Sequence, residues 1–146
     1  MMSNPQAKTL NGLLKGELAA VETYTQAIDK IDSDHGGLEL KQIRAEHHNA
    51  ANIVLQHIVR MGDEPETDSG AWGLFAHAVE GAAKLLGNSA ALRALKDGEQ
   101  SGIRMYERIL EDNRVPDDFR DLVRTRLLPQ TRAHIPVIDH LMSMLS

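Results

Sequence analysis

The fold is decided by a stretch near the start of the chain, residues 10–31, which reads LNGLLKGELAAVETYTQAIDKI. Its apolar side chains recur at alternating steps of three and four, the spacing that places residues on one face of an α-helix. One member of that stripe is a carboxylate, because Glu17 stands between Leu14 and Val21 where an aliphatic residue is expected. The stretch therefore predicts a long amphipathic helix that carries an acid on its buried face.

Three further stretches repeat this pattern, each with a polar residue on an apolar stripe. The polar positions are His47 within residues 40–61, Glu99 within residues 92–109 and His134 within residues 123–144. A buried carboxylate is costly unless it is paired or binds a metal. Two glutamates and two histidines that face one core can offset each other's cost. A metal site, or the remnant of one, is therefore the first functional hypothesis.

Composition limits the other options. A chain of 146 residues is near the usual domain size, and residues 1–146 are predicted to form one domain. The chain has no cysteine, so any metal must bind to oxygen and nitrogen.

The net charge of -5 and the lack of a basic stretch argue against a nucleic-acid partner. Because no apolar run reaches membrane-spanning length and residues 1–9 hold no apolar signal core, we expect no membrane association and a cytoplasmic location.

Turn and cap signals divide the chain into helices. The four long ones are expected at residues 4–32, 38–61, 88–113 and from 115 onward. Gly62 is expected to stop the second helix, and Asn88 or Ser89 to cap the third. Pro129 and Pro136 are expected to kink or break the fourth.

The lengths of the connections predict the topology. Short links join the first helix to the second and the third to the fourth, so each pair should be antiparallel. The longer stretch between the second and third helices contains an apolar segment, residues 71–86, that we expect to form a short extra helix. This stretch is long enough to return along the bundle, so the second and third helices should run parallel. The prediction is an all-α, ferritin-like four-helix bundle with one long crossover.

Short motifs in these helices resemble a known family. Gly16-Glu17-Leu18, Glu46-His47, Gly98-Glu99 and Met105-Tyr106 look like the rubrerythrin branch of the ferritin-like superfamily. As a whole the chain is similar to an uncharacterised bacterial ferritin-like family that is known only as a domain of unknown function (DUF). The resemblance implies a four-helix bundle and, in the metal-binding relatives, a di-iron centre.

The chain departs from the ligand pattern of those relatives, which use a lone Glu on two helices and Glu-x-x-His on the other two. Both lone glutamates and both histidines are present, but Arg44 and Thr131 stand three residues before the histidines, where the partner carboxylates would be. Two irons need bridging carboxylates, so a standard di-iron centre is not expected. The donor types favour one zinc or iron ion instead. Its predicted ligands are Glu17, His47, Glu99 and His134.

Other polar residues are expected around this site. Tyr24, Tyr106 and Gln130 lie on the same stripes, and His48 lies at the flank. They also permit a metal-free alternative, because buried acids can be satisfied by hydrogen bonds alone. Two functions therefore stay open. One is a metal-binding ferritin-like protein, with catalysis undecided, and the other is a non-catalytic helical module that acts through self-association or protein binding. A homodimer is the expected assembly.

Overall fold

The computed structural model describes residues 5–31, 36–67 and 87–145. Within these ranges the chain is helical and has no strand, so the all-α prediction is confirmed. Three long helices are α1 (Pro5–Lys30), α2 (Gly37–Arg60) and α4 (Asn88–Glu111). The fourth helical run consists of α5 (Asp117–Leu122), the π-helix η3 (Val123–Leu127) and α6 (Leu128–Leu145). The short helix expected at residues 71–86 lies outside the described residues.

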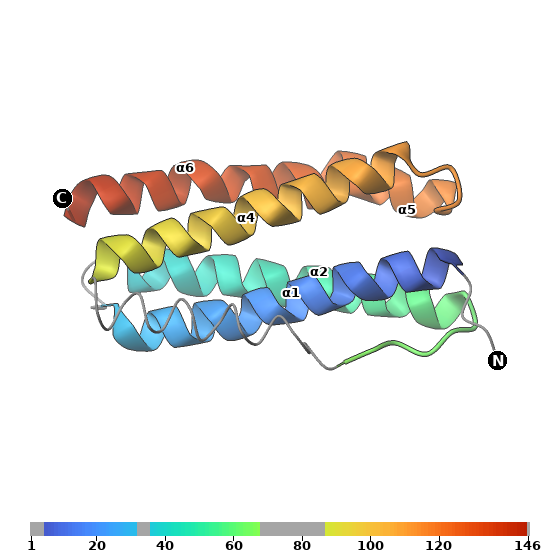
Figure 1. Ribbon diagram of the computed structural model, residues 1–146, viewed down its shortest axis with the longest axis horizontal. Helices are drawn as coiled ribbons and strands as arrows, with labels where there is room; N and C mark the ends of the chain where they lie inside the picture. Colours follow the sequence, from blue (N-terminus) through green and yellow to red (C-terminus); the bar gives the residue numbers. More distant parts are fainter. Residues whose placement is uncertain (1–4, 32–35, 68–86, 146) are drawn as a thin grey trace.

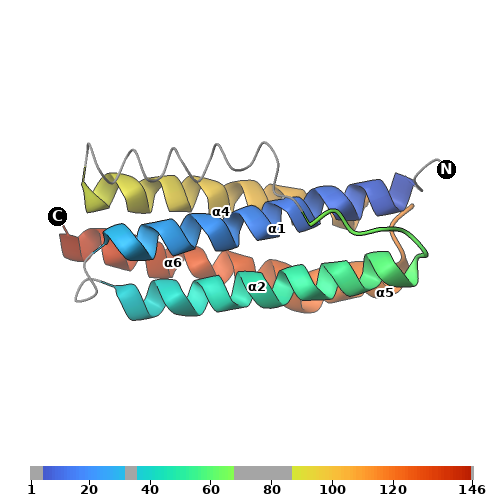
Figure 2. The same ribbon diagram turned by 90° about the horizontal axis from the view of Figure 1, so that it is seen from below.

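The long helices form a bundle of two antiparallel pairs (Figure 1). One pair is α1 with α2, and the other is α4 with α6. Helix α2 and helix α4 both begin at the end of the bundle where the chain terminates and run toward the end where α5 lies, so they are parallel, as the sequence predicts. Seen from below, α4 lies beside α1 and α6 beside α2, which leaves α2 and α4 diagonally opposed (Figure 2). No helix in the described part of the chain is long and apolar enough to span a membrane.

Glycines mark the ends of α2. Gly62, the predicted stop, has a positive φ of 80° and follows Met61, the C-cap of this helix. Gly36, which precedes the helix, has a φ of 110°, and a Cβ at this position would lie 2.6 Å from a methyl carbon of Leu141. Only glycine suits both that backbone conformation and the close approach of α6. Gly36, at the start of α2, thus lies directly against α6.

Two predicted details are corrected: the cap of helix α4 and the break that was one of the two alternatives for the fourth helical run. Gly87 precedes α4, and no side chain caps that end, so Asn88 and Ser89 are not caps. In the fourth run, the irregular turn is the π-helix η3, where the amide of Leu128 donates a hydrogen bond to the carbonyl of Val123 five residues back. Pro129 follows at once, and a wider turn gives its ring room near the preceding carbonyls. The chain stays helical through both prolines instead of breaking.

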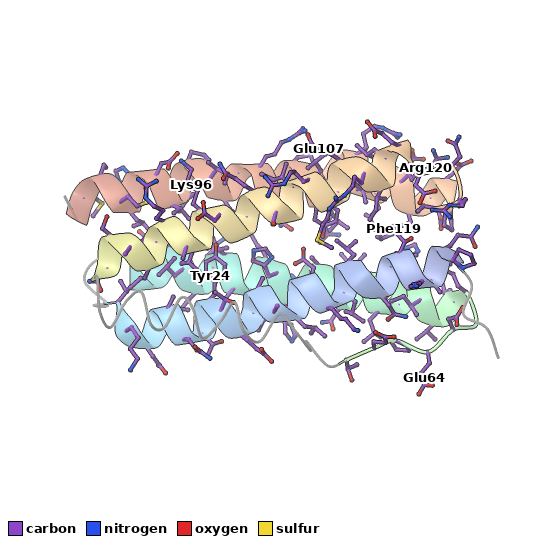
Figure 3. All side chains as sticks on the ribbon, in the orientation of Figure 1. Tyr24, Glu64, Lys96, Glu107, Phe119 and Arg120 are labelled. Atoms are coloured by element: carbon purple, nitrogen blue, oxygen red, sulfur yellow. The ribbon has the colours of Figure 1, made fainter. Side chains whose placement is uncertain are left out.

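Two apolar layers enclose the middle of the bundle. One layer contains Phe119, Val54 and Ile58, and the other contains Tyr24, Leu40 and Leu95. Phe119 and Tyr24 lie toward opposite halves of the bundle (Figure 3). The buried polar side chains lie between these two apolar layers. Burial in such surroundings is costly for a charged group unless it is paired.

Candidate metal centre

Each helix of the bundle contributes one buried polar residue to the space between the apolar layers. The exposed fractions are 5% for Glu17 on α1, 6% for His47 on α2, 3% for Glu99 on α4 and 4% for His134 on α6. These are the residues that interrupt the four apolar stripes of the sequence. The structure brings all four together, through the contacts described next.

His47 connects the two buried glutamates. Its Nδ1 lies 2.7 Å from Oε2 of Glu17, and its Nε2 lies 2.5 Å from Oε1 of Glu99. Burial by itself lowers the pKa of His47, but the charges of Glu17 and Glu99 and their hydrogen bonds outweigh burial and raise it to about 10. Without a metal, His47 is therefore an imidazolium that donates one hydrogen bond to each carboxylate.

Glu99 is the centre of the cluster. Its Oε1 also accepts a hydrogen bond from the hydroxyl of Tyr24 at 2.7 Å, and its Oε2 lies 3.0 Å from Nδ1 of His134. Burial raises the pKa of Glu99, but the charge of His47 and the hydrogen bonds from both histidines outweigh it and lower the pKa to about 2. Glu99 is thus an ionised carboxylate shared by two histidines.

Two tyrosines complete the hydrogen bonding of the acids. The hydroxyl of Tyr106 donates to Oε1 of Glu17 at 2.9 Å, and that of Tyr24 donates to Glu99. Burial, together with the charge of the adjacent glutamate, raises the pKa of each tyrosine well above its usual value. Both hydroxyls therefore stay protonated and act as donors.

Glu46 joins the cluster although it was not predicted as a site residue. Its Oε1 lies 2.7 Å from Nε2 of His134, and its side chain is 27% exposed. A signal for it exists in the sequence, because Glu46 comes three residues after Ile43 and four before Ala50, both on the stripe of α2. Glu46 therefore lies at the edge of the buried face, where its carboxylate reaches α6.

Two predicted neighbours of the site lie away from it. His48 is exposed and lines a hollow on the outer face of α1 and α2 with Thr25 and Arg44, because one residue past His47 is about 100° further around the helix. Gln130 is half-buried, and no hydrogen bond joins it to the cluster in the described part of the chain. Thr131 takes the buried place on that turn.

The ligand atoms of His47, Glu99 and His134 all lie within 4.8 Å of one another. Nε2 of His47 and Nδ1 of His134 are the ring nitrogens that face Glu99, at 2.5 Å from its Oε1 and 3.0 Å from its Oε2. Glu17 contacts the opposite nitrogen of His47, on the far side of the ring. The three inward-facing groups are the part of the cluster that can hold an ion.

The fold and the site define an all-helical bundle with a buried Glu/His cluster at its centre. The model of the family described as Domain of unknown function (DUF2383) matches residues 6–112, and the chain belongs to this family. The matched range contains Glu17, Glu46, His47 and Glu99 but ends before His134. No curated protein and no solved structure matches the chain.

Proposed function

We propose that this protein binds one divalent metal ion, zinc or ferrous iron, at the buried Glu/His cluster. The ligands are Nε2 of His47, the carboxylate of Glu99 and Nδ1 of His134. Two histidines with one carboxylate occur as zinc ligands and also as the facial triad of non-haem iron sites. Donor atoms at about 2.1 Å from an ion stand roughly 3.4 Å apart in a tetrahedral site. The ligand atoms lie within 4.8 Å of one another, so these side chains must move closer together when the ion binds.

The observation that carries this proposal is the pair of carboxylates behind the histidines. Glu17 lies 2.7 Å from Nδ1 of His47, and Glu46 lies 2.7 Å from Nε2 of His134. Metal-bound histidines commonly donate their other ring N–H to a carboxylate, which fixes the tautomer and orients the ring. Both histidines have that partner here, and both direct the remaining nitrogen toward Glu99. Glu17 thereby becomes an outer partner of His47 instead of a ligand.

The ferritin-like relationship belongs to the same proposal. It is supported by the parallel α2 and α4 and by the direct contacts that join one polar residue from each helix. In this view the protein is a ferritin-like bundle whose site has been reduced from two ions to one. The reduction follows from the missing Glu-x-x-His carboxylates.

Cobalt(II) provides a direct test, because it substitutes for zinc or ferrous iron and its absorption reports the ligands. We expect the metal-free protein to bind one cobalt per chain. His134→Gln should abolish binding, whereas His48→Gln, which alters an exposed histidine on the outer face, should leave it unchanged. A wild type that binds no ion, and whose melting temperature is unaffected by a chelator, would overturn the proposal.

A specific observation also favours the metal-free alternative. Among the buried side-chain polar atoms of the described residues, only Nε of Arg120 lacks a hydrogen-bond partner, so the cluster is satisfied without an ion. Such a network fixes the rotation of four helices and suits a non-catalytic module that acts through self-association or protein binding. In this case Glu17→Gln should destabilise the protein, because it removes one of the two carboxylates that pair with the buried imidazolium of His47. The same cobalt titration decides between the two functions.

A further inference from the structure

Two sets of cavities reach the cluster, and they differ in size. Between α1 and α4 lie two small cavities of about 40 Å³ each, and both are lined by Gly16, Gly98, His47 and Glu99. Between α2 and α6 lies a hollow of about 350 Å³, and His134 forms part of its wall. The buried centre is therefore approached from two opposite faces of the bundle.

Size separates the two routes for a hydrated cation. A cavity needs about 10–15 Å³ of space for each water molecule, so an ion with six waters needs roughly 60–90 Å³. Neither cavity between α1 and α4 offers that much, because each measures about 40 Å³. The hollow between α2 and α6 offers several times as much. An ion can thus keep its waters in the α2–α6 hollow and lose them close to the cluster.

The walls differ in chemistry as well. Glu39, Gln42 and Glu46 line the α2–α6 hollow at a spacing of three and then four residues, which places their oxygen atoms along one face of α2. No lysine or arginine of the described residues lines it. This row of oxygens ends at Glu46, 2.7 Å from Nε2 of His134. The cavities between α1 and α4 contain no carboxylate besides the cluster's own Glu17 and Glu99.

We propose that the divalent ion reaches the buried site through the hollow between α2 and α6, where Glu39 and Glu46 capture it. This inference rests on the proposed metal site. A cleft lined by one sign of charge concentrates the opposite ion and raises its association rate. Carboxylate and amide oxygens then replace waters of the ion before it passes His134.

Glu39 allows capture to be separated from binding at the site. It lies seven residues from Glu46, which is about 10 Å along a helix and beyond the Debye length at physiological salt. Glu39→Gln should therefore slow cobalt association about threefold or more at low ionic strength, while the dissociation constant measured at physiological salt stays nearly unchanged. Ala133→Phe, at an exposed residue of the wall, should narrow the hollow and slow association further.

Two matched variants serve as controls in the same stopped-flow measurement with cobalt(II) and metal-free protein. Asp97→Asn removes an exposed acid of α4 away from the hollow. Gly16→Ala narrows the cavities between α1 and α4, and its Cβ meets Met105 at an ordinary 3.6 Å, so the fold should tolerate it. Both should associate at the wild-type rate.

The outcomes distinguish the route from the site. Slow association in Glu39→Gln and Ala133→Phe, with normal controls, supports entry through the α2–α6 hollow. Slow association in Gly16→Ala alone, or equal rates in every variant, overturns the route while equilibrium titration still shows the bound ion. A wild type without bound cobalt at equilibrium overturns the site and the route together.

Discussion

Nε2 of His47 lies 2.5 Å from Oε1 of Glu99, the closest contact within the cluster, and it joins two helices that stand diagonally across the bundle. A diagonal contact of this kind passes through the centre of the core, where both groups are almost fully buried. Each group keeps the other charged, because the pKa of His47 is raised and that of Glu99 is lowered. A metal ion between them would replace the proton that now holds them together.

The assignment of ligands predicts unequal effects of two conservative substitutions. Glu99→Gln removes a ligand and should reduce cobalt affinity to background. Glu17→Gln removes an outer carboxylate and should weaken binding by about 10–100-fold, the usual loss for such partners of a ligating histidine. Isothermal titration of both variants measures the difference.

Glu46→Gln provides the matched comparison for the second histidine and should resemble Glu17→Gln, because both carboxylates contact the outer nitrogen of a histidine. If Glu17→Gln lost cobalt binding as completely as Glu99→Gln, this result would show that Glu17 is a ligand, as the sequence pattern alone suggested.

The metal-free protein should be most stable at mildly acidic pH. The pKa of Glu99 falls from 4.5 to about 2 on folding, so its contribution is complete above pH 4.5 and is lost as the pH falls toward 2. The pKa of His47 rises from 6.5 to about 10, so its contribution is complete below pH 6.5 and is lost as the pH rises toward 10. Both contributions are complete only between pH 4.5 and 6.5.

Urea denaturation in the presence of a chelator, repeated across this range, measures the pH profile. In Glu99→Gln the loss of unfolding free energy at acid pH should disappear, because an amide does not titrate. The loss at alkaline pH should become smaller, because Glu99 is one cause of the raised pKa of His47. A free energy of unfolding that rises up to about pH 6.5 and stays level from there to pH 9 would show that His47 is neutral in the folded protein.

Much of the site follows from helix periodicity, since the apolar stripes place Glu17, His47, Glu99 and His134 inside the bundle. The stripe of the fourth helix is less well determined. The sequence stripe passes from Leu127 through Gln130 and Val137, whereas the structure buries Thr131 and Ile138. Both choices alternate steps of three and four and share Leu127, His134 and Leu141, so periodicity alone cannot choose between them.

Contacts between helices that are distant in the sequence could not be predicted in the same way. The approach of Glu46 to His134 depends on the rotation of α2 relative to α6, which the apolar pattern fixes only to within a residue. For the same reason, the apolar pattern predicted His48 at the flank of the site, whereas its side chain is exposed on the outer face of α2. The π-helical turn of η3 depends on how the chain accommodates Pro129, and no count of apolar residues reveals it.

The two buried tyrosines should differ in their effect on stability. Tyr106→Phe removes the one hydrogen bond that Oε1 of Glu17 accepts within the described residues. Tyr24→Phe removes one of two hydrogen bonds to Oε1 of Glu99, which still accepts the bond from Nε2 of His47. A hydrogen bond to a charged group contributes about 1.5–3 kcal/mol. Tyr106→Phe should lose about that much and Tyr24→Phe less. Urea denaturation of the metal-free variants measures both, and an equal or reversed order would contradict the network.

The last prediction is that the protein has no di-iron ferroxidase activity. Such chemistry needs two irons about 3.5–4 Å apart with carboxylates that bridge them. Arg44, at one of the replaced positions, extends outward and donates a hydrogen bond to Thr25 at 3.2 Å. Thr131, at the other, donates to the carbonyl of Leu127 at 2.8 Å. Neither position supplies a carboxylate to the cluster.

Glu46 does not restore the missing bridge. It contacts Nε2 of His134, while Glu99 contacts Nδ1 of the same ring, so the imidazole stands between the two carboxylates. They cannot bridge one pair of irons in this arrangement. Anaerobic titration with ferrous iron should end at one iron per chain, and exposure to air should give no rapid rise in absorbance. Two irons retained per chain with fast oxidation in the wild type, and one in Glu46→Gln, would show instead that Glu46 turns inward as a ligand.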